Sequence, residues 1–137
     1  MTDATKFQFT NPSVPKAYDE FFVPRLFEPW AKLLLDEVNL QSGEAVLDVA
    51  TGPGTVARLA AARLGSRGRI VAADIAVLML DIARAKPVVA GAARIEYVES
   101  PAAPLAPRLV HSTLCYVSRG YSFFRTGQLR CERCIAS

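Results

Sequence analysis

Hydrophobic and polar positions follow a helical period over the first part of the chain. From Lys16 to Val38, apolar residues recur at three- and four-residue spacings, which predicts an amphipathic helical region. Pro24 lies inside this region and predicts the start of a second helix, because proline is favoured in the first helical turn. Residues 1–15 are polar and contain two prolines, so we expect them to form a loosely held arm.

Short apolar runs alternate with helical periods after residue 44. Three runs predict strands: Ala45–Val49, Arg69–Ala73 and Arg94–Val98. Two stretches between them predict helices: Val56–Leu64 and Val77–Lys86. Strands that alternate with helices predict an α/β fold with a parallel sheet and right-handed crossovers. We therefore expect a parallel sheet of three strands, which leading N-terminal helices precede.

Composition limits the class of protein. The chain has 137 residues, of which 51% are hydrophobic and 21% are charged, as in an ordinary globular domain. No apolar run reaches the roughly 18 residues that span a bilayer, and the polar N-terminus lacks the apolar segment of a signal peptide. Three cysteines is an odd number, which argues against a disulfide framework. We expect a cytoplasmic protein without a membrane span.

A glycine loop after the first expected strand is the strongest candidate for chemistry. Gly52 and Gly54 let a ligand approach the backbone, and the helix that follows points free N–H groups at it. Asp74 comes 20 residues after Gly54, at the end of the second strand, where a carboxylate can accept hydrogen bonds from ribose hydroxyls. This pattern predicts an adenosine-containing ligand. The simpler alternative is an ordinary turn, with Asp74 as a helix cap.

Two classes of adenosine ligand fit this loop. The spacing Gly52-x-Gly54-x-x-Ala57 agrees with a dinucleotide fingerprint, which would indicate a nicotinamide-dependent oxidoreductase. Asp48 argues against it, because an acid inside the first strand would repel a pyrophosphate, whereas it favours the ammonium and sulfonium of S-adenosylmethionine. The long helical region before the first strand is also unusual for dinucleotide folds, which open with the strand.

The same residues resemble the class I S-adenosylmethionine-dependent methyltransferases, and most of all their ubiquinone/menaquinone-biosynthesis type. The segments that carry the resemblance are Tyr18-Asp19, Phe27–Trp30, Val46–Gly54, Asp74-Ile75 with Met79-Leu80, and Ile95–Glu99. The similarity covers about residues 16–106, and we expect none beyond residue 107. It implies a Rossmann-like sheet, methyl transfer to a small-molecule acceptor, and no nucleic-acid partner.

The resemblance implies a set of cofactor-binding residues. These are Asp48, Ala50, Thr51, Gly52, Gly54, Asp74, Ile75, Met79 and Ala102. Gly52 and Gly54 would contact the methionyl part, so that a side chain at Gly54 would fill its space, and Asp48 would help to hold the ammonium group. Asp74 would bind the ribose.

Adenine recognition is the part of the site that departs from the family's pattern. By the resemblance, Ile75 and Met79 would line the adenine, although Met79 fits a plain core position equally well. Ser100-Pro101 stands where the family often has Gly-Asp, which moves adenine recognition to backbone groups near Ala102. The matched region shows no general base, so the catalytic residues stay unassigned.

The last 30 residues differ in composition from the rest. Residues 108–137 carry a net charge of +4, against −1 for residues 1–107, and contain all three cysteines and the only histidine. Cys131-x-x-Cys134 is one pair only, and two cysteines cannot close a structural zinc site, so we expect no metal. The arginines alternate with apolar residues and form no run, which argues against a nucleic-acid-binding tail.

A shift of reading frame explains this C-terminal stretch. With permitted codons, each begun at the third base of the previous one, Arg108–Ala136 can read A-S-S-F-D-V-V-L-C-Q-Q-G-L-Q-F-F-P-D-R-P-A-A-L-R-A-M-H-R. That sequence resembles the family's fourth strand and the helix after it. We therefore predict a frameshift near residues 105–107, which divides the chain into a cofactor-binding half (1–107) and an out-of-frame tail (108–137).

This division has structural and functional consequences. We expect Leu109–Val117 to supply a makeshift strand beside the first one, because an uncovered central edge invites pairing. We expect Gly120–Ser137 to be poorly packed. The competing class of function is a non-catalytic fragment that binds an adenosine cofactor without transferring a methyl group.

Overall fold

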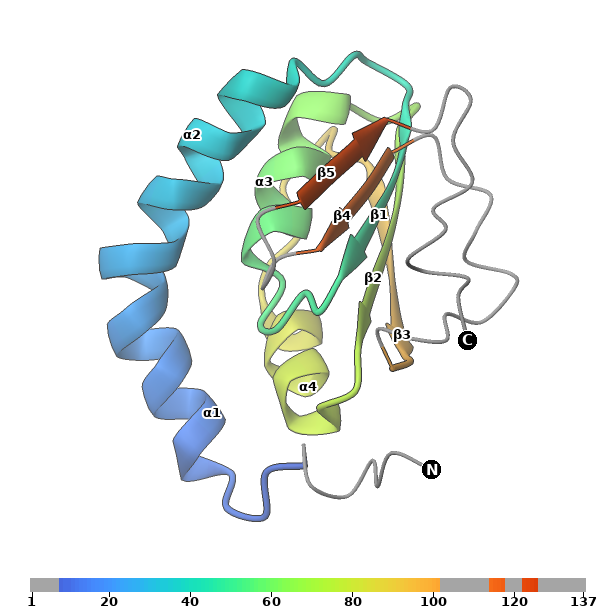
Figure 1. Ribbon diagram of the computed structural model, residues 1–137. Helices are drawn as coiled ribbons and strands as arrows, with labels where there is room; N and C mark the ends of the chain where they lie inside the picture. The colour runs from blue at the N-terminus through green and yellow to red at the C-terminus, as the bar shows by residue number, and fades with distance from the viewer. Residues whose placement is uncertain (1–7, 102–113, 118–121, 126–137) are drawn as a thin grey trace.

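The computed structural model describes residues 8–101, 114–117 and 122–125. Its centre is a sheet with the strand order β3-β2-β1-β4-β5 (Figure 1). The three expected strands are present: β1 (Ala45–Val49), β2 (Arg69–Asp74) and β3 (Arg94–Glu99). They are mutually parallel, and α3 (Thr55–Leu64) and α4 (Val77–Ala85) connect them. The predicted α/β fold with a parallel sheet is confirmed.

The burial of each strand follows from its place in the sheet. β1 is central, and Val46–Val49 are all buried, which explains why its sequence is a continuous apolar run interrupted only by Asp48. β3 lies at the edge, and its side chains alternate between Glu96, which is exposed, and Ile95 and Tyr97, which pack toward the core. The sequence therefore places Asp48 in the interior, at a position where an acid is exceptional.

Two further strands extend the sheet beyond β1. β4 (Leu114–Val117) pairs parallel with β1, with Val46 opposite Leu114, and β5 (Ser122–Arg125) pairs antiparallel with β4. β4 confirms the expectation of a strand from Leu109–Val117 beside the first one. β5 was not predicted. It lies within Gly120–Ser137, which we expected to be poorly packed, and its backbone pairs with β4. The rest of Gly120–Ser137 lies outside the described residues.

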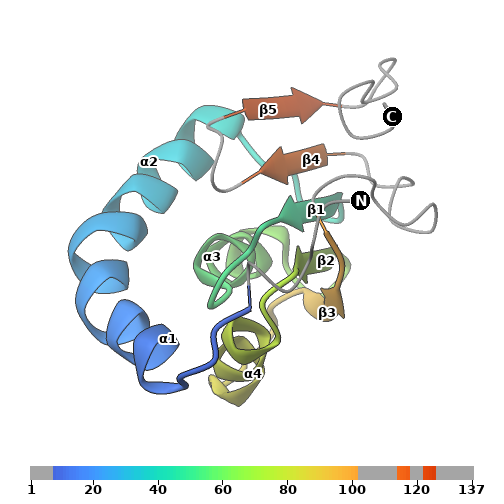
Figure 2. The same ribbon diagram turned by 60° about the horizontal axis from the view of Figure 1, so that its bottom comes forward.

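A helical arm precedes the sheet and arches along one side of it (Figures 1 and 2). The arm consists of α1 (Ser13–Ala17), a π-helical segment η2 (Tyr18–Phe27) and α2 (Glu28–Val38), and the residues at both junctions keep helical dihedrals. α2 ends at Asn39, which adopts a left-handed conformation with φ of 50°. The arm as a whole confirms the predicted leading helices.

Two details of the arm correct the sequence-based expectation. Residues 13–15 belong to α1, and Pro15 is buried, so this part of residues 1–15 is not loosely held. Pro24 does not begin a second helix but lies inside η2. Proline removes a backbone N–H and clashes with the preceding turn of an α-helix, and the wider π-helical turn accommodates it without ending the helix.

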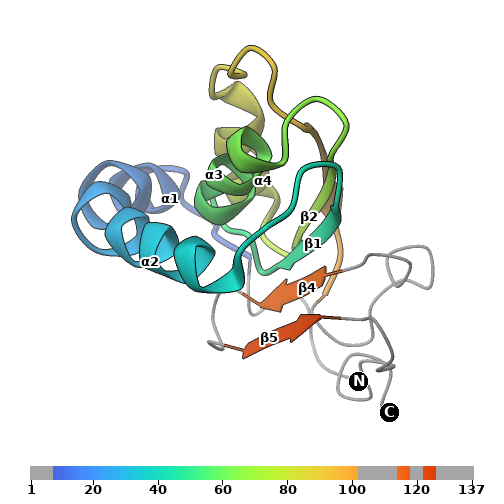
Figure 3. The same cartoon turned by 90° about the horizontal axis from the view of Figure 1, so that it is seen from above.

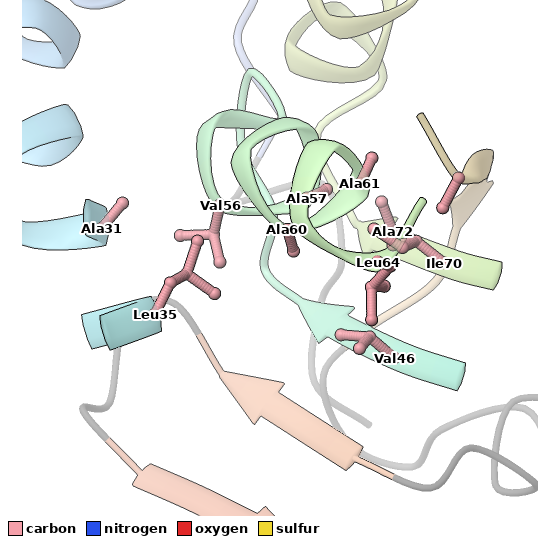
Figure 4. Close-up of a cluster of buried hydrophobic side chains, with 11 residues drawn as sticks. Ala31, Leu35, Val46, Val56, Ala57, Ala60, Ala61, Leu64, Ile70 and Ala72 are labelled. Atoms are coloured by element: carbon pink, nitrogen blue, oxygen red, sulfur yellow. The ribbon is translucent and has the colours of Figure 1, made fainter. Parts of the chain in front are cut away.

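The hydrophobic core fixes α3 between the arm and the sheet. Ala57 and Ala60 of α3 are fully buried, and their small side chains let the helix lie close to the sheet. Figure 4 shows Leu35 of α2 beside Val56 on one flank of α3, with the sheet residues on the other. Seen from above, the helices gather on one face of the sheet (Figure 3). This packing positions the N-terminus of α3, where the glycine loop ends.

Candidate functional site

The loop between β1 and α3 makes a tight turn that only certain residues tolerate. Three of its residues have left-handed backbone conformations: Ala50 (φ 58°), Gly52 (φ 57°) and Gly54 (φ 77°). The Thr51 N–H donates to the Ala73 carbonyl at 3.0 Å, which continues the pairing of β1 with β2 into the loop. The Gly54 N–H donates to the Thr51 carbonyl at 3.1 Å and closes the turn. The loop is therefore a defined structure anchored to β2.

The two glycines of this loop have different surroundings. A Cβ atom at Gly52 would meet no atom of the described residues within 4 Å, so this side of the loop is open with respect to that part of the chain. A Cβ atom at Gly54 would lie 3.1 Å from Ala83 Cβ and 3.2 Å from the Tyr97 hydroxyl. A side chain at Gly54 thus meets the protein itself, which corrects the expectation that it would fill the methionyl space. Gly52 is the glycine whose missing side chain leaves room for a ligand.

Asp74 links this loop to the next helix. Its Oδ2 accepts a hydrogen bond from the Gly52 N–H at 2.7 Å, and its Oδ1 accepts one from the Ala76 N–H at 2.8 Å. The second contact closes a turn just before α4, whose N-cap residue is Ala76 and has no side-chain cap. Each carboxylate oxygen keeps a further lone pair, so that a ribose hydroxyl can still donate to it. The alternative of Asp74 as a helix cap is therefore wrong, and its carboxylate instead joins the glycine loop to the segment that precedes α4.

Asp48 is a buried acid directly beneath the loop. It is 0% exposed, and its Oδ2 accepts a hydrogen bond of 2.6 Å from the Thr51 hydroxyl. Its Oδ1 has no hydrogen-bond partner among the described residues. Burial raises the pKa of this carboxyl from 3.8 to about 7, although the Thr51 hydroxyl and the Ala57 backbone amide lower it. Asp48 can therefore change its charge near neutral pH.

Replacing Asp48 by asparagine should remove one component of the pH dependence of folding. The folded protein keeps the Asp48 proton between pH 4 and 7, whereas the unfolded chain has released it, so this group lowers stability as the pH rises to about 7. From pH 5 to pH 8 the wild type should lose about 3 kcal/mol that Asp48→Asn does not lose. Urea unfolding at several pH values measures this difference.

The control is Asp81→Asn, because Asp81 lies on the exposed side of α4 and pairs with the neighbouring Arg84. Its unfolding free energy should follow that of the wild type at every pH. Equal pH dependence in the wild type and in Asp48→Asn would contradict the raised pKa of Asp48.

Three further residues were expected to bind the cofactor: Ile75, Met79 and Ala102. Ile75 is partly buried, and its carbonyl accepts a hydrogen bond of 2.7 Å from the Gln8 side chain. Met79 is 2% exposed, which agrees with the alternative of a core position, and its contact with adenine stays a prediction. Ala102 lies outside the described residues, next to Pro101, which is exposed.

Sequence reasoning missed several side chains that contact the site. Tyr97 packs against Gly54 from β3, and burial raises the pKa of its hydroxyl. Lys86 donates to the carbonyl of Pro53 and pairs with Asp19 of η2, which is 67 residues away in the sequence. No local pattern signals such a long-range pair. Only the position of Lys86 at the predicted end of α4, just before Pro87, could have drawn attention to it.

The described residues contain neither a cluster of metal ligands nor a helix that could span a membrane. In residues 8–101, 114–117 and 122–125, no three His, Cys, Asp or Glu side chains lie together as a metal site requires. Within the same ranges, no helix is long and apolar enough to cross a membrane.

The sequence matches one family over most of its length. The model of the ubiE/COQ5 methyltransferase family aligns with residues 8–122. The chain belongs to the ubiE/COQ5 methyltransferase family. S-adenosylmethionine is the cofactor of this family. The match begins before the expected residue 16 and continues to residue 122, so the expectation of no resemblance beyond residue 107 is wrong for residues 108–122.

Individual relatives and solved structures agree with this family. The ubiquinone/menaquinone biosynthesis C-methyltransferase UbiE of Xylella fastidiosa is 34% identical over 97 residues, which are 68% of this chain and 38% of the relative. The 2-phytyl-1,4-naphtoquinone methyltransferase of Thermosynechococcus vestitus is 39% identical over 59 residues, 43% of this chain and 26% of the relative.

Solved structures of methyltransferases are similar to this chain in fold as well as in sequence. TrmN from Thermus thermophilus superposes with a TM-score of 0.58 at 30% identity, over 66% of this chain and 27% of that one. A SAM-dependent methyltransferase from Aquifex aeolicus gives 0.56 at 28% identity, over 72% of this chain and 51% of that one. The chain therefore has a methyltransferase fold, and it spans less than two fifths of the length of the UbiE relative.

Proposed function

We propose that this chain provides the S-adenosylmethionine-binding half of a methyltransferase that acts on a small-molecule acceptor. The observation that carries the proposal is the open face of Gly52 directly beside the Asp74 carboxylate, at the carboxyl ends of β1 and β2. Ligands of open α/β sheets bind at this edge. The names of the UbiE and phytyl-naphthoquinone relatives favour a quinone precursor as the acceptor.

The groups around the loop fit the chemistry of this cofactor. The N-cap residue of α3 is Gly54, which offers no side-chain cap, so N–H groups of the first turn suit the carboxylate of the methionyl part. The Asp48 carboxyl lies close to where the ammonium group would lie, a positive charge there would favour its ionised form, and its Oδ1 lacks a hydrogen-bond donor within the described chain. Asp74 would accept hydrogen bonds from the ribose. The bound cofactor supplies the methyl group on its sulfonium, and the protein's own task is to hold and orient.

Two competing functions make different predictions in solution. A nicotinamide-dependent oxidoreductase would bind NAD in preference to S-adenosylmethionine, and a non-catalytic fragment would bind S-adenosylmethionine without transferring its methyl group. Calorimetric titration with both ligands decides the first question, and a methyl-transfer assay on a quinone acceptor decides the second. Tighter binding of NAD would overturn the proposed cofactor. A cytoplasmic location remains the expectation from the sequence.

Asp74→Ala should weaken the binding of S-adenosylmethionine by about 1.5–3 kcal/mol, the usual contribution of hydrogen bonds to a charged group. The substitution removes the acceptor for the ribose and also the bond to the Gly52 N–H. Asp74→Asn keeps one acceptor oxygen and should have a smaller effect. Isothermal titration calorimetry measures both changes. Asp81→Ala is the control, because it removes a carboxylate from the exposed side of α4. Unchanged affinity in a folded Asp74→Ala would contradict the assignment.

We also propose that residues 108–137 are encoded out of frame. In the shifted frame, the positions of β4 (Leu114–Val117) read V-V-L-C, so both frames place an apolar run beside β1. This agreement explains how a strand can form beside β1 in either frame. Sequencing the encoding DNA around codons 100–110 in independent isolates tests the proposal. If the corrected reading frame reached a stop codon soon after the junction in every isolate, the proposal would be overturned.

A further inference from the structure

One lysine connects the glycine loop to the N-terminal arm. Lys86 follows α4, where the chain turns to an extended conformation (φ −74°, ψ 144°) before Pro87. Its Nζ lies 2.5 Å from Asp19 Oδ1 and 3.3 Å from the Pro53 carbonyl oxygen. Asp19 belongs to η2 and Pro53 to the tip of the loop. Three elements that are distant in the sequence therefore meet at one ammonium group.

The burial of this group distinguishes it from the other ion pairs. The side chains of Lys86 and Asp19 are only 19% and 20% exposed, whereas Lys32 and Glu28, the i,i+4 pair on α2, are 55% and 40% exposed. A charge that is largely withdrawn from water needs an opposite charge and hydrogen-bond partners. Asp19 provides the charge for Lys86, and the Pro53 carbonyl provides a second acceptor.

Pro53, in turn, needs a hydrogen-bond donor for its carbonyl oxygen. It is buried and has no N–H, so its carbonyl is the only backbone group through which hydrogen bonding can fix it. Gly52 and Gly54 on either side both have left-handed conformations and would otherwise allow the loop to rearrange. The bond from Lys86 holds the loop at the residue between them.

The residues before the helical arm contact the site at a second point. Gln8 donates its side-chain N–H to the carbonyl of Ile75, the residue that directly follows Asp74. The N-terminal part of the chain is thus bonded to the segment after β2 through Gln8, which precedes the arm, and to the loop after β1 through Asp19 of the arm and Lys86. Both segments carry residues of the proposed cofactor site.

We infer that Lys86 is a positioning residue for the cofactor loop, and that its pairing with Asp19 makes the position of the N-terminal arm part of the conformation that binds S-adenosylmethionine. This inference rests on the proposed function for the identity of the ligand. Its structural part, the order of the loop, does not depend on any ligand.

The test compares four variants of the full chain: Lys86→Met, Asp19→Asn, the double variant and the control Lys32→Met. Lys86→Met should bind S-adenosylmethionine about tenfold more weakly, and Asp19→Asn about threefold, on the scale of a lost charge-assisted hydrogen bond. The double variant should be no weaker than Lys86→Met, because the two residues act as one unit. Lys32→Met should bind as the wild type does.

Amide hydrogen exchange without ligand provides the second measurement. The amides of Thr51 and Gly54, whose hydrogen bonds anchor and close the loop, should exchange faster in Lys86→Met and Asp19→Asn, while those of β2 and β3 keep the protection of the wild type. A uniform increase over the sheet would indicate general destabilisation and would overturn the positioning role. Wild-type exchange at the loop together with wild-type affinity would overturn it as well.

The two proposals fail in different ways. If the wild type binds no S-adenosylmethionine, the proposed function fails, and the exchange of the loop amides still decides the role of Lys86. If the wild type binds and the variants bind equally well with an unchanged loop, only the role of Lys86 fails. Asp19→Asn preserves the shape of its side chain, so it tests the inference even if Lys86→Met does not fold.

Discussion

Gly54→Val should unfold the protein or leave it several kcal/mol less stable, whereas Gly52→Val should leave it folded and prevent binding of S-adenosylmethionine. At Gly54 a Cβ atom would lie 3.1 Å from Ala83 Cβ and 3.2 Å from the Tyr97 hydroxyl, and the residue has a φ of 77°. Overpacking costs about 1–3 kcal/mol, and a β-branched residue in a left-handed conformation adds about 1–2 kcal/mol.

At Gly52 the conformational cost is similar, since φ is 57°, but an added Cβ meets no atom within 4 Å in the part of the chain that the structure describes. It would instead occupy the open face where the cofactor is proposed to lie. Thermal unfolding should therefore show a much larger loss for Gly54→Val than for Gly52→Val, and calorimetry should show no binding by Gly52→Val. Gly91→Val is a matched control, which should retain binding, because Gly91 also has a positive φ of 76° with no described atom within 4 Å of an added Cβ and is not a residue of the proposed site. Full binding by Gly52→Val would place the ligand elsewhere.

The fold of residues 45–99 could be predicted from the sequence because its signals are local. The strand Ala45–Val49 is predicted to the residue, since a central strand with nearly every residue buried is a mostly apolar run. The helix boundaries near Gly65 and Pro87 follow from the residues that end helices. The π-helical segment around Pro24 was missed, because a proline in a sequence normally predicts a helix boundary. Here the helix continues through Pro24, and no local pattern indicates this.

The candidate site could be predicted only as far as its backbone pattern. Spacing brings Gly52 and Asp74 together, since both follow the carboxyl ends of neighbouring parallel strands. Spacing cannot tell that Gly54 is excluded from the open face by Tyr97, which comes from the third strand. Nor can it pair Lys86 with Asp19, because that contact depends on how the arm packs against α4. Contacts between elements are set by tertiary packing, which no local pattern records.

Restoring the reading frame should convert a chain without measurable turnover into an active methyltransferase. Methyl transfer needs an acceptor pocket as well as a cofactor site, because both reactants must be held in line. Ligands of such sheets bind where the strand order reverses, so the proposed cofactor would lie between β1 and β4. The present chain fills the position beside β1 with Leu114–Val117, in a segment that we propose to be out of frame. One wall of the crevice is therefore not the authentic one.

The experiment inserts one base near codons 105–107, which restores the shifted frame, and compares the product with the present chain. We expect a longer protein with higher stability and with turnover of about 1 per second or more, as ordinary enzymes show. Inserting two bases instead is the matched control and should produce no activity, because it opens the third frame. An ordinary rate in the uncorrected chain would contradict the proposal, since a complete acceptor pocket would then already exist. The same amount of S-adenosylmethionine binding in both proteins with activity in one alone would assign the missing part to the acceptor side.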